Sequence, residues 1–443
     1  MENNVFQDKN IVRSYFKLSV PLVMSLVVTL IYNLADTFFV AQTGDTNIIA
    51  GVSLGAPVFT LLMSFGNIFA QGGSSLLSIL RGKNKSEEVR RVSSFCFYIL
   101  LAAGVIIGLL MLLLRKQAVM LLGADAQTLG PTTDYYTWLA LGAPFIMVSF
   151  VHSNLLRAEG MSTASMIGTV TGAVVNIILD PIFISILGMG ARGAAIATVI
   201  GYIVTDLYFI WVVRFRSRIL SMKPTEMTIP ASYVRSILTV GTPAAIVNIM
   251  QSVCVVLTNQ FLLPYGNEKI AAMGIALKVN MIALLLLTGF AFGGAPLFGY
   301  YYGAGNREML SKLFNFCLRF ILGTALVLTA ALFFAAPVMM NGFTGNRTIA
   351  EAGALMLRLQ VITTPCVSIV LLLTIVFQSF GKSTGSFLLS ISRQGVVFLA
   401  VLVLASRFAG YTGILCSQAV SDLISAVIAG ILFRVMLLEQ FRS

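Results

Sequence analysis

The stretch FAQGGSSLLSILRGKNKSEEVRR at residues 69–91 returns in outline as FAFGGAPLFGYYYGAGNREMLSK at residues 290–312. The paired glycines, the later glycine and the basic ends align in the two copies. Two further pairs keep nearly the same offset, 221 and 220 residues: RAEGMSTASM at 157–166 with QSFGKSTGSF at 378–387, and GARGAAIATV at 190–199 with GYTGILCSQA at 410–419. Similarity at a fixed offset indicates a duplicated architecture, so the chain is expected to consist of two related halves.

The composition is that of a membrane protein. The 443 residues are 58% hydrophobic and only 10% charged, with a mean hydropathy of +0.92. Soluble proteins carry about 25% charged residues. Runs of about 20 apolar residues recur along the chain and predict an all-α fold with twelve transmembrane helices. The predicted spans are 15–41, 48–80, 93–114, 132–155, 165–187, 192–213, 235–264, 270–300, 313–340, 353–379, 386–406 and 412–436.

The basic residues lie unevenly on the two sides of these spans. Nineteen Lys and Arg lie in the N-terminal segment and in every second loop, against seven in the other loops. The positive-inside rule therefore places both termini in the cytoplasm. This distribution accounts for the net charge of +12 and argues against a nucleic-acid partner. Six helices per half return the chain to its starting side, which predicts parallel lobes at 1–213 and 235–443 joined by a cytoplasmic linker at 214–234.

Carboxylates within the predicted spans are the strongest functional signal. A charge at the centre of a membrane helix is costly, so such residues usually mark ion or substrate pathways. Tyr32 and Asp36 are four residues apart, as are Asn176 and Asp180, so each pair shares a helix face. Pro181 follows Asp180 and removes a backbone hydrogen-bond donor. The carbonyl left free is a candidate cation ligand, and the interrupted helix is a candidate hinge. The alternative is a purely structural hydrogen bond between the first and fifth helices.

The repeat-equivalent positions in the second half lack these groups. Asp36 aligns with Thr258 and Asp180 with Val401, and helices 7 to 11 contain no interior acid. The carboxylate chemistry is therefore expected to be confined to the first half. Further polar residues are candidates for a substrate cleft, with their orientation left open: Asn33, Asn154, Asp206 and Lys278. Arg393 is interpreted as an inner-leaflet anchor or an interhelical hydrogen bonder.

These residues together resemble a known family. The first span PLVMSLVVTLIYNLADTFFV, the two glycine-rich stretches, LLRAEG and NIILDP are similar in order and spacing to the multidrug and toxic compound extrusion (MATE) family, and the pattern is nearest to its DinF-type and MepA-type bacterial branches. The resemblance implies two pseudo-symmetric lobes in a V shape in a bacterial or archaeal cytoplasmic membrane. It implies a monomer that exports cationic amphipathic compounds in exchange for H⁺ or Na⁺. No other cofactor is implied.

The resemblance also suggests roles for individual residues. The cation site of the first lobe carries over to Asp36, Asn176, Asp180 and Thr198, with Tyr32 beside them. Asn154 is the nearest match to an asparagine of the same network. Pro21 is the equivalent of a proline at which the first helix bends. NorM-type members place a sodium site in the second lobe, and the acids of that site are missing here.

Other functions stay open at this point. The leading interpretation is a secondary antiporter that exports drugs or metabolites, with H⁺ and Na⁺ equally compatible with a carboxylate, amide and hydroxyl cluster. The alternative is a flippase for a lipid-linked precursor, which would require several cationic residues in the cleft, where Lys278 is the main candidate. A membrane enzyme is disfavoured, because the only close acid pair, Glu87 and Glu88, lies in a basic loop.

Overall fold

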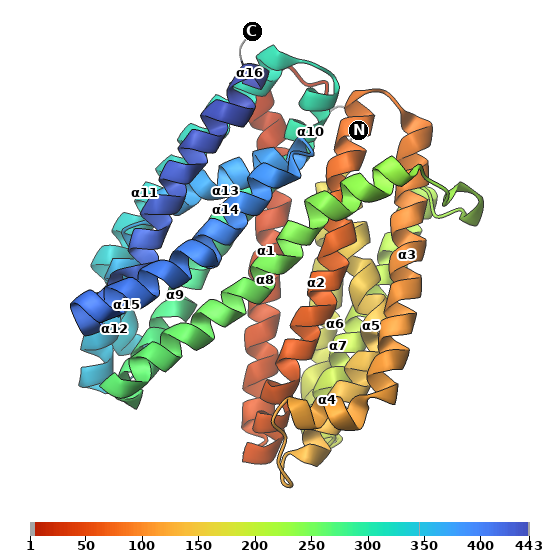
Figure 1. Ribbon diagram of the computed structural model, residues 1–443. Coiled ribbons are helices and arrows are strands. Elements are labelled where there is room, and N and C mark those ends of the chain that lie inside the picture. The colour runs from red at the N-terminus through yellow and green to blue at the C-terminus, as the bar shows by residue number, and fades with distance from the viewer. Residues whose placement is uncertain (1–4, 345, 442–443) are drawn as a thin grey trace. The chain divides into compact units, whose positions relative to one another are not determined.

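The computed structural model describes residues 5–344 and 346–441, and these are helical with short connections. The helices of the first half are α1 (Ile11–Gln42), α2 (Thr46–Gly82), α3 (Ser86–Leu113), α4 (Arg115–Leu121), α5 (Leu129–Ala158), α6 (Ser162–Asp180), the π-helix η2 (Pro181–Ile186) and α7 (Gly190–Phe215) (Figure 1). A 3₁₀ turn, η3 (Pro224–Glu226), lies in the segment that joins the halves.

The second half is divided into more pieces than the first. Its helices are α8 (Ala231–Leu262), the 3₁₀ turn η4 (Leu263–Tyr265), α9 (Asn267–Gly293), α10 (Ala295–Gly303), α11 (Arg307–Phe343), α12 (Arg347–Val361), α13 (Thr364–Ser379), α14 (Ser383–Gln394), α15 (Val396–Leu432), the π-helix η5 (Phe433–Leu437) and α16 (Leu438–Phe441). The all-α fold class predicted from the sequence is confirmed.

Each of the twelve predicted spans falls on helix. Among the described residues, nine stretches are long and apolar enough to cross a membrane, and α12 with α13 makes a tenth across a bend of 45°. One of the nine, Ser383–Phe441, covers the last two predicted spans. α15 is interrupted within it at Gly410 (φ 54°, ψ −128°), and a side chain on Gly413 would strike the carbonyl of Ala405. Residues eight apart on a straight helix are about 12 Å apart, so the chain turns back here.

The chain divides into two compact units that are not contiguous halves. Unit 1 contains Val20–Ala245 together with the start of the chain up to Asp8, and unit 2 contains Lys9–Ser19 and the chain from Ile246 onward. α1 and α8 therefore each pass from one unit to the other. Both do so within three residues of a proline inside the helix, Pro21 in α1 and Pro243 in α8.

The paired glycines of the repeated stretch permit these crossings. A side chain on Gly72 of α2 would meet the backbone of Ile237 of α8, within unit 1. A side chain on Gly293 of α9 would meet the backbone of Ser19 of α1, within unit 2. Glycine is required where two backbones approach this closely. The repeat is thus visible as the same helix-to-helix contact in each unit.

The packing in unit 1 places the predicted carboxylate helices together. α5 is the central helix and contacts α2, α3, α6 and α7, while α6 packs along α7. Gly172 of α6 allows this approach, because a side chain there would strike the Thr205 hydroxyl of α7. In unit 2, α9 packs against α11, α12 and α13, while α13 also contacts α14 and α15. These contacts position the polar groups described next.

Candidate functional site

A buried amide and carboxylate pair lies at the end of α6. Asn176 donates from Nδ2 to Asp180 Oδ1 at 3.4 Å and contacts Thr198 Oγ1 of α7 at 3.5 Å. Asp180 is fully buried and Asn176 is 2% exposed. Asp180 is the last residue of α6, and Pro181 begins the wider π-helical turn of η2. The missing amide of proline interrupts the regular hydrogen-bond ladder directly below the carboxylate.

Asp36 of α1 belongs to the same electrostatic environment. Its carboxylate interacts through charge with Asp180, and both carboxylates act on Tyr135 of α5. One turn earlier on α1, Tyr32 shares a hydrogen bond with Tyr202 of α7. The structure thus places Asn176, Asp180 and Thr198 in contact, while Asp36 is linked to Asp180 through charge and Tyr32 lies one turn earlier on α1. We call Asp36, Asn176, Asp180 and Thr198 the unit 1 carboxylate cluster.

The unit 1 carboxylate cluster contains acceptors without donors. Asp36 Oδ1, Asn176 Oδ1 and Asp180 Oδ2 are buried and have no hydrogen-bond partner among the described residues. None of the ion pairs in the described chain involves either aspartate. A buried charge without a partner is strongly unfavourable. Buried oxygens that lack donors are therefore suited to a bound proton or to a small cation with oxygen ligands.

A third carboxylate lies further along α7. Thr198, Tyr202 and Asp206 follow one another at intervals of four residues and therefore share one face of the helix. Asp206 is 3% exposed, and neither of its carboxylate oxygens has a partner in the described chain. Its charge acts on Tyr202. Tyr202 thus stands between the unit 1 carboxylate cluster and Asp206.

The other sequence candidates are found in more varied places. Asn33 is exposed and donates to the Thr29 carbonyl of its own helix at 2.8 Å. Asn154 is buried, and its Oδ1 accepts from Arg157 Nη2 at 2.7 Å, so its described contacts do not join it to the unit 1 carboxylate cluster. Lys278 is exposed on α9. Pro21 lies inside α1, which continues through it as a helix.

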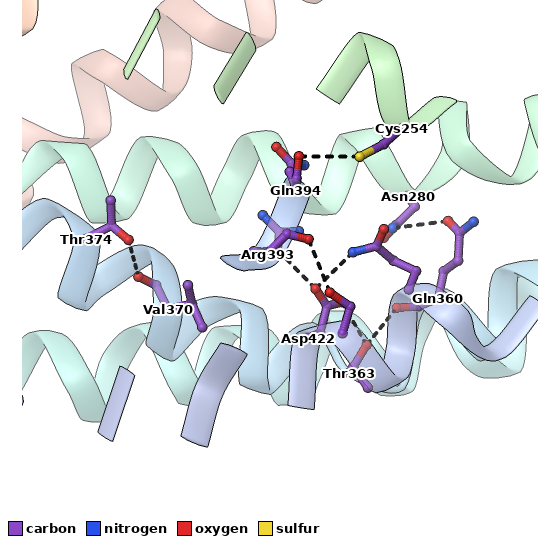
Figure 2. Close-up of polar contacts among 11 residues, drawn as sticks. Cys254, Asn280, Gln360, Thr363, Val370, Thr374, Arg393, Gln394 and Asp422 are labelled. Atoms are coloured by element: carbon purple, nitrogen blue, oxygen red, sulfur yellow. Dashed lines mark hydrogen bonds and ion pairs between the residues drawn. The ribbon is translucent and has the colours of Figure 1, made fainter. Parts of the chain in front are cut away.

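Unit 2 contains a polar cluster that the sequence analysis missed. Arg393 of α14 forms an ion pair with Asp422 of α15 at 3.1 Å, and their side chains are 14% and 2% exposed. Asp422 also accepts from Gln418 Nε2 at 3.0 Å and from Thr363 Oγ1 at 3.1 Å (Figure 2). Nearby, Asn280 of α9 donates to Gln360 Oε1 at 3.4 Å.

This cluster corrects the expectation that buried acids are confined to the first half. Helices 7 to 11 contain no interior acid, but Asp422 lies in the twelfth predicted span. The signal that could have revealed it is the presence of opposite charges in two consecutive spans, at positions 393 and 422. Of the two interpretations considered for Arg393, the structure supports an interhelical contact.

Comparison with known proteins identifies the family. The family model described as MatE matches the chain twice, at residues 21–182 and 243–404. The two matches have equal length, are offset by 222 residues and together cover more than half of the chain. The chain belongs to the MATE family. Both matches begin at one of the prolines beside which a helix changes unit, Pro21 and Pro243.

Curated relatives and solved structures agree with this assignment. The chain is 30% identical over 424 residues to the multidrug export protein MepA of Staphylococcus saprophyticus, covering 96% of this chain and 94% of the relative. It is 28% identical to MepA of Staphylococcus aureus strain NCTC 8325 over the same shares. A crystal structure of a MATE protein in complex with MaD3S matches with a TM-score of 0.93 at 23% identity, covering 100% of this chain and 99% of the other. That likeness supports the two-lobe MATE fold.

The MATE matches include part of each polar site. Asp36, Asn176 and Asp180 lie in the first match, and Arg393 lies in the second. Thr198 and Asp422 lie beyond the matched ranges. Each match therefore ends before the residue that completes its site, Thr198 in unit 1 and Asp422 in unit 2.

Proposed function

We propose that this MATE protein is a secondary antiporter that exports cationic amphipathic compounds in exchange for H⁺ or Na⁺ by alternating access. The names of its curated relatives, multidrug export proteins, support the export of small molecules. The residue pattern supports cation coupling. We propose residues 1–213 and 235–443 as its lobes, with both termini in the cytoplasm.

The observation that carries the proposal is the set of buried oxygens without hydrogen-bond partners in the unit 1 carboxylate cluster. Asp180 is fully buried, keeps one oxygen without a partner and interacts with a second carboxylate, Asp36. A structural hydrogen-bond network would pair these oxygens, since unpaired buried polar groups destabilise a fold. A site that binds and releases a cation must leave them available.

Two cations fit the groups that are present. Na⁺ prefers oxygen ligands, and the cluster offers carboxylate oxygens at Asp36 and Asp180, an amide oxygen at Asn176 and a hydroxyl at Thr198. A proton on Asp180 would turn Oδ2 into a donor and remove one of the two buried charges. Either monovalent cation compensates one of the two negative charges, which lowers the cost of keeping both carboxylates in an apolar surrounding.

Coupling follows if ion and substrate favour different conformations. A ligand shifts an equilibrium between two states only by its difference in affinity for them. We propose that the coupling ion favours one arrangement of α1 and α6 and that an organic cation favours the other. Pro21 and Pro181 lie where the hydrogen-bond ladders of these helices are weakened, which makes them the proposed hinges.

Transport driven by separate gradients tests this proposal. A fluorescent organic cation is added outside inverted membrane vesicles, which are given either a pH gradient or a sodium gradient. Accumulation with one gradient and its collapse by the matching ionophore would support antiport and identify the ion. Equal accumulation without either gradient would refute cation coupling.

The lipid-precursor flippase is less well supported. The curated relatives reported above are named for drug export. Lys278, the main cationic candidate for binding a pyrophosphate group, does not line the described polar pocket of unit 2. We therefore do not propose this function.

A further inference from the structure

Unit 2 encloses a pocket between its polar cluster and an apolar wall. The cavity has a volume of about 90 Å³ and is lined by Arg393 and Asp422, by amides such as Asn280 and Gln418, and by apolar groups including Leu277 and Phe398. A single water needs about 10–15 Å³ measured in this way. The pocket therefore has room for about six to nine groups of this size, which is enough for a small organic cation.

Two interrupted helices meet at this pocket. α12 and α13 are separated by a bend at Ile362 and Thr363, and α14 and α15 are separated at Gly395 (φ −148°, ψ −114°). Thr363 contacts Asp422 from the first break, while Arg393 and Gln394 come from the end of α14 at the second. In transporters, discontinuous helices near the middle of the membrane supply substrate and ion sites. Both breaks lie near the centres of their predicted spans.

The ion pair in the pocket is built asymmetrically. Asp422 accepts hydrogen bonds from Thr363 (Figure 2) and from Gln418 in addition to its contact with Arg393. Arg393 reaches the carboxylate through Nε alone, at 3.1 Å. The strong form of this pair is bidentate, with two parallel hydrogen bonds. Asp422 is thus a fixed acceptor, whereas Arg393 is held by a single contact.

The pocket also contains an acceptor with no donor. Asn280 is 9% exposed, and its Oδ1 has no hydrogen-bond partner in the described chain. With Asp422 it gives the pocket two oxygen acceptors that can receive N–H groups. An anionic ligand would face Asp422, whereas a cationic ligand at Asp422 leaves the Asn280 oxygen available to a second cation.

The pocket corresponds by the internal repeat to the unit 1 carboxylate cluster. Thr258 and Gln418 line it, and they align with Asp36 and Thr198. The two repeats thus use equivalent helix positions for polar sites. The site in unit 1 has no internal cation among the described residues, whereas the site in unit 2 carries its own in Arg393.

We propose that Arg393 is a built-in competitor for Asp422, and that an organic cation with N–H donors binds in the unit 2 pocket by displacing it. A primary ammonium or amidinium group takes the place of Nε at Asp422, so the buried carboxylate never loses its counter-charge. The displaced guanidinium donates to the unpartnered Asn280 oxygen. The apolar part of the ligand contacts Leu277 and Phe398. The ligand class extends the proposed export function, but the binding step needs no ion gradient and no unit 1 carboxylate.

Binding of two matched probes to the purified full-length protein tests this inference. Benzylammonium carries three N–H donors, and benzyltrimethylammonium has the same ring and charge with none. Isothermal titration should show that wild-type protein prefers benzylammonium. Arg393→Gln should strengthen benzylammonium binding by about tenfold or more. If Arg393 occupies Asp422 in about nine-tenths of the molecules, only about one-tenth can bind, so the apparent affinity of the wild type is lowered about tenfold. Asp422→Asn and the double variant should lose the preference.

Several controls keep the result interpretable. Arg319→Gln removes an exposed arginine of α11 that does not line the pocket, and it should leave both affinities unchanged. If Arg393→Gln fails to fold, Arg393→Lys retains a cation with a shorter reach and should bind benzylammonium more tightly than wild type. Equal or weaker binding in the folded Arg393 variants, or an unchanged preference in Asp422→Asn, would overturn the inference. Loss of gradient-driven transport in Asp180→Asn with this binding intact would separate the two proposals.

Discussion

Asn176 and Asp180 contact one another across a single turn of α6, at 3.4 Å between Nδ2 and Oδ1, and the other oxygen of each side chain has no partner in the described chain. The pair is therefore half satisfied. One contact orients the carboxylate, while the remaining oxygens stay available for a cation. This arrangement determines which substitutions should separate folding from coupling.

We expect Asp180→Asn and Asp36→Asn each to abolish gradient-driven export while leaving the protein folded and inserted. Asparagine retains the shape of aspartate and some of its hydrogen bonding, but it neither titrates nor carries the charge that holds a cation. Vesicle transport under the coupling gradient and thermal unfolding of the purified variants measure the two properties separately.

Val401→Ala provides the matched control for this prediction. Val401 is the repeat-equivalent of Asp180 in unit 2 and carries no charge in the native chain. Its truncation should leave coupled transport near the wild-type rate. Wild-type export by both asparagine variants would show that the unit 1 carboxylate cluster is not the coupling site.

Asp206→Asn is expected to slow coupled transport without removing the ion dependence. Neither carboxylate oxygen of Asp206 has a hydrogen-bond partner in the described chain, and its charge interacts with Tyr202. Tyr202 is hydrogen-bonded to Tyr32, which lies beside the unit 1 carboxylate cluster. A carboxylate in this position is suited to receive a proton on its way along α7. Proton release on substrate binding, measured with a pH dye, should fall in Asp206→Asn. Asp134→Asn, an exposed acid of α5, should behave as wild type, and equal proton release in both variants would count against a role for Asp206.

The local signals in the sequence were sufficient for the helices and for the first polar site. Apolar runs of membrane length leave little choice of secondary structure, because a backbone in lipid must satisfy its own hydrogen bonds. Intervals of four residues placed Asn176 beside Asp180 without knowledge of the fold. The glycine pairs revealed the duplication because close backbone contact tolerates no other residue there.

Contacts between distant segments were not accessible in the same way. The exchange of Lys9–Ser19 into unit 2 depends on packing between α1 and α9, which no local pattern encodes. The contact of Arg393 with Asp422 joins two helices whose facing sides the sequence does not specify. Asn154 was predicted from a motif position, but its main polar partner is Arg157, one turn further along α5.

Cysteine labelling should place both termini in the cytoplasm. In a variant without native cysteines, Asp45→Cys lies in the short connection between α1 and α2, and Lys85→Cys lies between α2 and α3. A membrane-impermeant maleimide applied to intact cells should label position 45 and leave position 85 unlabelled. Labelling of both positions from the same side would contradict the orientation inferred from the basic residues.

Glu159, in the turn between α5 and α6, should make stability depend on pH. Burial raises the pKa of its carboxyl group, and hydrogen bonds from Ser217 and the Arg218 amide only partly oppose this effect. The folded protein therefore binds this proton more tightly than the unfolded chain does. The stability that the proton contributes is present below the unfolded pKa and is lost as pH rises through the folded pKa.

Glu159→Gln should remove this part of the pH dependence. Glutamine carries no charge to bury. It keeps a single oxygen, which accepts from only one of the two donors, because Ser217 and the Arg218 amide bind different oxygens of Glu159. The unfolding midpoint of the wild type should fall relative to that of the variant as pH rises from the acid range toward neutrality. Parallel curves for the two proteins would show that Glu159 does not contribute to the pH dependence.

Gly72 and Gly293, which are equivalent in the two repeats, should be required for the close contacts of α2 with α8 and of α9 with α1. Gly72→Ala would push a methyl group into the backbone of Ile237, and Gly293→Ala would push one into the backbone of Ser19. Overpacking of this kind costs about 1–3 kcal/mol, and backbone neighbours relax less readily than side chains. Each variant should therefore unfold at a clearly lower temperature than wild type. Gly323→Ala and Gly430→Ala introduce the same methyl group in other helices, at positions with nothing within 4 Å, and should be neutral or slightly stabilising because alanine favours helix. If all four variants unfolded at the same temperature, the close backbone contacts at Gly72 and Gly293 would not be formed as described.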